Sequence, residues 1–190
     1  MESVRRFGLT IRLDPSRKQT STFARVAGAR RFCFNVCVAA IRENHDQWAA
    51  EEAAGVPRSE RIRPPSAQDL EQRWRRCRPE WAREVSSWVF SWACREAAQA
   101  HRNFLAGRTR FPRFATKGRN RDRFTFAGRD VTLVAGSVTL PKIGEVAIAG
   151  ACPAQAELRR LLRRDRARIT SRPSPATRMG PGGCPSRSNG

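Results

Sequence analysis

An alternating stretch near the N-terminus constrains this chain more than any other feature of its 190 residues. Every second residue of the segment is apolar: Phe7, Leu9, Ile11 and Leu13. This is the period of a strand buried on one face, and we expect a strand over residues 4–13. A lone strand is not stable in water, and the next segments with strand character come only after residue 120. We therefore expect the intervening residues to be inserted between strands of one antiparallel sheet.

The inserted segment has the patterns of helices. After Asp14-Pro15, which suits a cap and a first turn, apolar residues recur every three, four or seven positions over residues 16–52. A second helix is expected over residues 66–77, because Ser66 and Asp69 form a variant of the capping box. We expect a third helix to begin at Pro79. Its stripe of apolar side chains is predicted to face the other helices: Trp81, Val85, Trp88, Trp92 and Phe104.

Strand patterns return after Gly107. Phe124 and Phe126 alternate with polar residues, and three short apolar pairs follow, separated by turns that contain glycine. These patterns predict an α+β fold. Its parts would be a small antiparallel barrel or sheet from residues 1–14 and 108–149, with a helical bundle at residues 15–107 inserted into it.

The last forty residues differ in composition from the rest. Residues 150–190 combine an Arg-rich run with a stretch rich in Pro, Gly and Ser that has no apolar period. Such a segment cannot build a core, and we expect a disordered basic tail. An amphipathic RNA-binding helix at residues 155–168 is the alternative.

The net charge of +20 comes from 37 Lys and Arg against 17 Asp and Glu, more than solubility requires. Nucleic acid is the expected partner, because each neutralised phosphate releases condensed counterions. The excess of Arg over Lys fits recognition by guanidinium groups, and fits a GC-rich genome equally well. No window reaches the length of a membrane span. We expect a cytoplasmic, nucleoid-associated protein with no membrane or small-molecule partner.

The cysteines give little sign of a metal site. There are six of them: Cys33, Cys37, Cys77, Cys94, Cys152 and Cys184. They form no C-x-x-C pair, and the chain has only two histidines, which argues against structural zinc. We expect reduced thiols within a helical core, and neither a metal nor another cofactor.

The stretch RFPRFATKGRNRDRFTF at residues 110–126 mixes phenylalanines with basic residues. Phe124 and Phe126 are expected on the buried face of a strand, while Phe111 and Phe114 anchor a loop. A merely solvated surface normally mixes signs, and here only Asp122 offsets the cations. We predict nucleic-acid contacts for the basic residues: Arg108, Arg110, Arg113, Lys117, Arg119, Arg121 and Arg123.

The segment GARRFCFN at residues 28–35 offers a second candidate surface. Arg30 and Arg31 could bind phosphate or guanine, and Asn35 could pair with an adenine edge. Two structural alternatives stay open, because Arg30 lies on the apolar stripe and Asn35 could brace the packing. The other expected nucleic-acid contacts are Arg5, Arg6, Arg12 and Lys142.

Four separated motifs resemble the N-terminal part of the TnpB (OrfB) family, transposon-encoded proteins related to type V CRISPR effectors. They are RRFGLTIRLDPSRKQ, GARRFCFN, WAREVSSWVFSWACREAAQAHRNFLAGRTRFPRF and VTLPKIGEVAI, in that order. The resemblance covers residues 3–149. It implies a wedge-like barrel of strands, and a helical recognition lobe that older descriptions call a helix-turn-helix.

The resemblance also implies RNA-guided DNA cleavage, which in that family requires a C-terminal RuvC-type nuclease domain with clustered carboxylates. After Ile148 the chain departs from the family pattern, as a frameshift in GC-rich DNA would produce. We therefore expect a fragment that binds guide RNA or DNA through its basic surfaces, with no catalytic residues and no cleavage of its own. The alternatives are half of a split endonuclease completed by a separate chain, and a non-functional pseudogene product.

Overall fold

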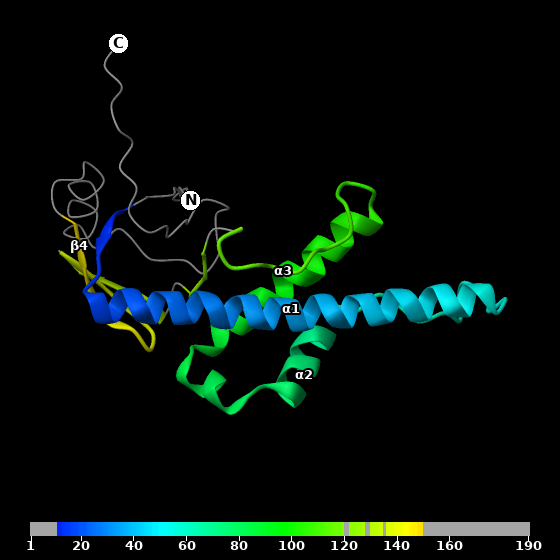
Figure 1. Ribbon diagram of the computed structural model, residues 1–190, viewed down its shortest axis with the longest axis horizontal. Helices are drawn as coiled ribbons and strands as arrows, with labels where there is room; N and C mark the ends of the chain where they lie inside the picture. The colour runs from blue at the N-terminus through cyan, green and yellow to red at the C-terminus, as the bar shows by residue number, and fades with distance from the viewer. Residues whose placement is uncertain (1–10, 120–121, 128–129, 135, 150–190) are drawn as a thin grey trace, which may run out of the picture. The chain divides into compact units, whose positions relative to one another are not determined.

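A computed structural model describes residues 11–119, 122–127, 130–134 and 136–149 (Figure 1). The predicted tail at residues 150–190 and residues 4–10 of the predicted N-terminal strand lie outside these residues. Contacts divide the chain into two compact units. We call Val26–Asn120 the helical unit, and Met1–Arg25 with Arg121–Gly190 the strand unit. The α+β fold class is confirmed, and the domain boundaries expected from sequence stay predictions.

The strand unit contains an open antiparallel sheet. Its strands are β1 (Leu13–Asp14), β2 (Thr132–Val134), β3 (Ser137–Leu140) and β4 (Gly144–Ile148), in the order β1-β4-β3-β2. In the pairing of β1 with β4, Leu13 lies opposite Ile148. The first strand therefore closes onto the last one, and the helices are inserted between them as the sequence predicts.

One face of the sheet holds its small core. Val138 lies opposite Val146, and both are buried together with Leu140. Partly buried side chains from outside the strands pack on this cluster, among them Phe23 and Phe126. The tight β3–β4 connection is closed by a hydrogen bond from Ile143 N to Leu140 O, and Lys142 within it has a φ of 64°.

Phe124 and Phe126 were expected on a strand, and this prediction is wrong. Residues 122–127 form irregular backbone. The two rings nevertheless pack: their centroids are 5.4 Å apart, and Phe124 lies 5.8 Å from Phe23. Alternation of apolar and polar residues here reflects a half-buried loop, because no neighbouring strand takes up its backbone hydrogen bonds in the described residues.

The helical unit is built from three helices. Helix α1 (Arg17–Ala53) begins in the strand unit and continues through the helical unit, as the long apolar period predicts. Helix α2 (Ala67–Cys77) begins with the predicted capping box, in which Ser66 Oγ accepts from Asp69 N at 3.2 Å. Helix α3 (Ser87–Leu105) completes the bundle. The core contains fully buried side chains from each helix, including Ile41, Leu70 and Val89.

The third helix departs from the prediction at its start. Pro79 precedes a short 3-10 helix, η1 (Glu80–Glu84), and α3 begins only at Ser87. The interruption breaks the expected aromatic stripe. Val89, Phe90 and Cys94 form the buried face of α3 instead, while Trp88 and Trp92 are half-buried beside Arg95 and Trp81 is 44% exposed.

None of the helices in the described part of the chain combines the length and apolar character needed to cross a membrane.

Candidate nucleic-acid interface

The segment 108–119, which we call the basic loop, is fixed to the helical unit by its apolar side chains. Phe111 packs edge-on against Phe104 of α3 with ring centroids 5.0 Å apart, and against His45 of α1 at 5.3 Å. Pro112 is buried beside it. Phe111 therefore anchors the loop as predicted, and the aromatic rings it meets come from both long helices.

His101 belongs to the same aromatic cluster. Its ring lies 6.2 Å from Phe111 and is 3% exposed. Burial, with a smaller contribution from His45, lowers the pKa of His101 below its ordinary value of 6.5. The neutral imidazole is thus the form that suits the site, and the cluster acts as an apolar anchor.

A side chain of α1 holds the loop backbone. The Asn35 amide donates to Ala115 O at 3.1 Å, and its Oδ1 accepts from Ala115 N at 2.7 Å. The side chain thus satisfies both backbone groups of Ala115, as a neighbouring strand would. The contact fits the alternative in which Asn35 braces the packing. Its amide nitrogen and its amide oxygen both already have hydrogen-bond partners.

Arg42 is a residue that the sequence analysis missed. It is exposed on α1, and its guanidinium lies 5.0 Å from the ring centroid of Phe114 and 5.9 Å from that of Phe111. Phe114 is 47% exposed, so it lies over Arg42 at the surface and is no buried anchor. Helical spacing is the sequence signal that could have identified Arg42, since it comes seven residues after Asn35 and falls on the same face of α1.

The basic side chains of the loop are exposed. They are Arg108, Arg110, Arg113, Lys117 and Arg119. The segment contains no Asp or Glu. The ion pairs found between described residues involve none of these five. Five cations within twelve residues repel one another at distances comparable to the screening length, and a polyanion would relieve that repulsion.

Arg30 is placed differently from the other predicted contacts. It is 7% exposed, its Nε donates to Glu96 Oε2 at 3.1 Å, and its guanidinium also lies over the Phe34 ring. The structural alternative fits this buried pair better than contact with nucleic acid does, because a phosphate would have to displace Glu96. Arg31 is half-buried on the same helix.

The remaining predicted contacts belong to the strand unit or lie outside the described residues. Arg12, Arg123 and Lys142 are exposed in the strand unit. Arg5, Arg6 and Arg121 are not among the described residues. The structure thus places the five cations of the basic loop and Arg42 in the helical unit, whereas Arg12, Arg123 and Lys142 belong to the strand unit.

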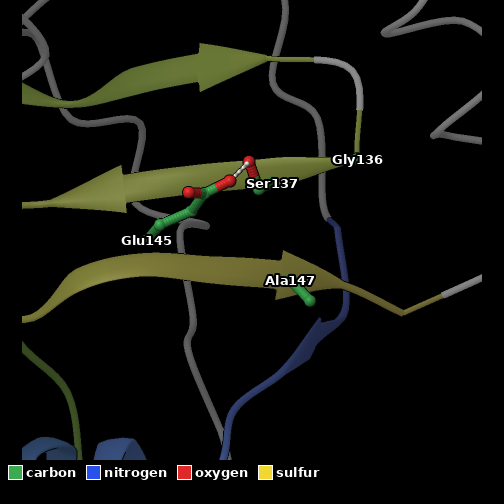
Figure 2. Close-up of a pocket in the computed structure, with 4 residues that line it drawn as sticks. All are labelled: Gly136, Ser137, Glu145 and Ala147. Carbon is green, nitrogen blue, oxygen red and sulfur yellow. Dashed lines mark hydrogen bonds between the residues drawn. The ribbon is translucent and has the colours of Figure 1, made fainter.

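The sheet carries a shallow depression of about 480 Å³ on its polar face, lined by Gly136, Ser137, Glu145 and Ala147 (Figure 2). Ser137 Oγ donates to Glu145 Oε1 at 2.5 Å. Ser137 and Glu145 lie diagonally across β3 and β4, so this bond is a cross-strand contact of an ordinary kind. We assign the pair to sheet stability.

Comparison with known proteins agrees with the sequence motifs. Residues 1–50 match the model of a helix-turn-helix domain family, that of OrfB from IS605. In the described part of this range the structure has β1 and one unbroken stretch of α1. The chain is 29% identical over 154 residues to Rv2885c of Mycobacterium tuberculosis, covering 70% of this chain and 32% of that protein.

A second relative is InsQ of Escherichia coli K12, 28% identical over 133 residues, with 70% of this chain and 31% of that protein covered. Both proteins are named for a proposed activity as RNA-guided DNA endonucleases. The chain spans about a third of the length of these relatives. The matches confirm the resemblance of the chain to an N-terminal portion of the TnpB/OrfB family. They support a transposase-associated fragment.

Proposed function

Because the chain resembles the N-terminal portion of the TnpB/OrfB family, we propose that it binds nucleic acid through the phosphate contacts of its basic loop. The observation that carries the proposal is the division of residues 108–119 into two sets. Phe111 and Pro112 pack inward, whereas five cations point to solvent without an acidic neighbour in the segment. A loop that is only solvated requires neither an inward-packed aromatic anchor nor a run of cations without acidic neighbours.

Anchoring the loop favours binding. Two hydrogen bonds between Asn35 and Ala115, one in each direction, and the aromatic cluster around Phe111 hold the backbone before any ligand arrives. Less conformational entropy is therefore lost when the arginines contact phosphates. Arginine forks also suit phosphate geometry, since two N–H groups can reach two oxygens at once.

The exposed ring of Phe114 suggests a second kind of contact. It packs with the Arg42 guanidinium and is 47% exposed. An unpaired base could stack there, as bases do on aromatic platforms of proteins that bind single strands. This contact would favour single-stranded segments of RNA or DNA over uniform duplex.

We propose binding without cleavage by the chain alone. The relatives' names state an endonuclease activity, and this chain aligns with about a third of their length. Within the described residues, the acidic groups do not form a cluster of three that could hold a metal ion. Guide RNA, target DNA or both could occupy the basic loop, and the choice between them is left to the experiment.

The test is salt-dependent binding, measured by fluorescence anisotropy with an RNA hairpin, a DNA single strand and a DNA duplex. The triple variant Arg108→Ser, Arg110→Ser, Arg113→Ser should lower the slope of log affinity against log salt by about three. The charge-matched control replaces three exposed arginines outside the loop: Arg58, Arg76 and Arg78. Equal losses in both variants would show that the excess charge binds without a defined site and would overturn the proposal.

A further inference from the structure

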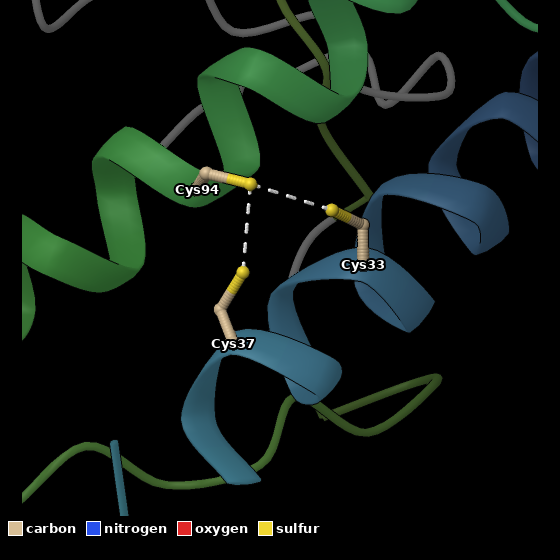
Figure 3. Close-up of side chains that lie close together, drawn as sticks. All are labelled: Cys33, Cys37 and Cys94. Carbon is tan, nitrogen blue, oxygen red and sulfur yellow. Dashed lines mark hydrogen bonds between the residues drawn. The ribbon is translucent and has the colours of Figure 1, made fainter. Parts of the chain in front are cut away.

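Three cysteine sulfurs converge in the core of the helical unit (Figure 3). Cys33 and Cys37 lie one turn apart on α1, and Cys94 faces them from α3. The Cys94 Sγ lies 3.8 Å from that of Cys33 and 3.5 Å from that of Cys37, and all three are within 4.8 Å of one another. The cluster is not part of the basic loop.

The spacing of the sulfurs matches a metal site. A metal bound to thiolates at about 2.3 Å holds its sulfurs roughly 3.8–4.0 Å apart in tetrahedral or trigonal geometry. The two separations measured from Cys94 lie close to this range without any covalent bond between the sulfurs, since all three cysteines are free.

The site is dry and has three ligands. Cys33, Cys37 and Cys94 are 0%, 1% and 0% exposed. Among the described residues, no fourth His, Cys, Asp or Glu joins the group. Structural zinc is almost always four-coordinate, and water could supply the missing ligand only at an open site. A soft ion that accepts three thiolates fits better, and copper(I) is the biological ion with that preference.

We infer that the Cys33–Cys37–Cys94 cluster is a trigonal thiolate site for copper(I) that ties α1 to α3. Binding would release the three thiol protons, and the single positive charge of the ion would offset part of the negative charge of the three buried thiolates. The ion would enter as the helices fold or open locally, because none of the three cluster cysteines is accessible in the folded unit.

The alternative is that the sulfurs only pack, as buried cysteines commonly do. The decisive variant keeps the three cluster cysteines and replaces the other three: Cys77→Ser, Cys152→Ser and Cys184→Ser. It keeps all three buried sulfurs of the cluster in place. Copper(I) is added without oxygen, against a chromophoric chelator that competes for it.

We expect this variant to bind one copper(I) per chain, with three sulfur neighbours by X-ray absorption and an increased thermal midpoint. Adding Cys94→Ala in that background should abolish both binding and the increase, with helix content by circular dichroism as the folding control. Failure of the three-cysteine variant to compete with the chelator would overturn the inference, as would fewer than three sulfur neighbours. Because that variant retains all three cluster cysteines, these outcomes hold even if Cys94→Ala does not fold.

Discussion

The helical unit and the strand unit build their cores in different ways. In the helical unit, side chains from three helices of 37, 11 and 19 residues are buried together, with Val38, Ile41 and Val89 at 0% exposure. In the strand unit, four strands of two to five residues bury Val138, Leu140 and Val146. The sheet also depends on pairing Leu13 with Ile148 across the whole insertion.

This difference suggests how function is distributed. Helices form their backbone hydrogen bonds locally, whereas the sheet closes a long loop before β1 and β4 can pair. The helical unit is therefore the firmer support, and the anchored basic loop is attached to it. The chain also offers a convenient probe, because all five tryptophans lie in the helical unit: Trp48, Trp74, Trp81, Trp88 and Trp92.

The largest expected effect comes from a cavity in the helical core. Ile41→Ala should lower the free energy of unfolding by about 2–5 kcal/mol, because a fully buried side chain is lost and its space is not refilled. Urea unfolding followed by tryptophan fluorescence measures it. An unchanged midpoint would contradict the assignment of this core.

A smaller loss is expected in the sheet. Val146→Ala removes two methyl groups from a side chain with 0% exposure, and should cost roughly 1.5–3 kcal/mol. Hydrogen exchange should show lower protection of the β3 and β4 amides, while the tryptophan transition keeps its midpoint. If both probes shift together, the two units unfold as one, and the comparison fails.

Replacing Asn35, which holds the basic loop, should weaken nucleic-acid binding without changing the charge of the loop. Asn35→Ala removes two hydrogen bonds worth about 1 kcal/mol each. We expect weaker nucleic-acid affinity with an unchanged salt slope, because all the cations remain. Asn44→Ala is the matched control, since Asn44 donates from the same helix to Arg63 O in another segment. Equal weakening in both variants would show that the basic loop does not need its anchor.

The smallest expected effect is a dependence of the free energy of unfolding on pH. Since the pKa of His101 is lowered on folding, the unfolded chain takes up the proton more readily. The contribution of His101 to the free energy of unfolding is therefore complete when the pH is above 6.5, the ordinary pKa of histidine. It declines as the pH falls below that value. Tryptophan-detected urea unfolding between pH 7.5 and 5.5 should show this decline, and His101→Phe should reduce it. A steeper decline in the variant would contradict the assignment.

Much of the fold follows from the sequence, because its signals are local. The long apolar period of α1 and the Ser66 cap correspond to observed elements, and Leu13 at the end of the alternating stretch lies in β1. The break before α3 was missed, because the steps between Trp81, Trp88 and Trp92 read as one continuous helix. The real helix restarts at Ser87 after a 3-10 turn.

The sequence predicts which residues of the candidate site are charged better than it predicts which residues they contact. The cations of the basic loop stand out in the sequence, and their exposure follows from the inward packing of Phe111. The pairing of Asn35 with Ala115 joins residues 80 positions apart, and no spacing rule encodes it. The same holds for Cys94 opposite Cys33, since C-x-x-C spacing cannot detect ligands from two helices.

The most direct test of the central claim uses the chain's three lysines, Lys18, Lys117 and Lys142, which are all exposed. Lysine acetylation, read by mass spectrometry with and without bound nucleic acid, compares the basic loop with two positions in the strand unit. We expect bound nucleic acid to protect Lys117 strongly and Lys18 little. Lys117 reacting equally in both states, while Lys18 or Lys142 becomes protected, would contradict it.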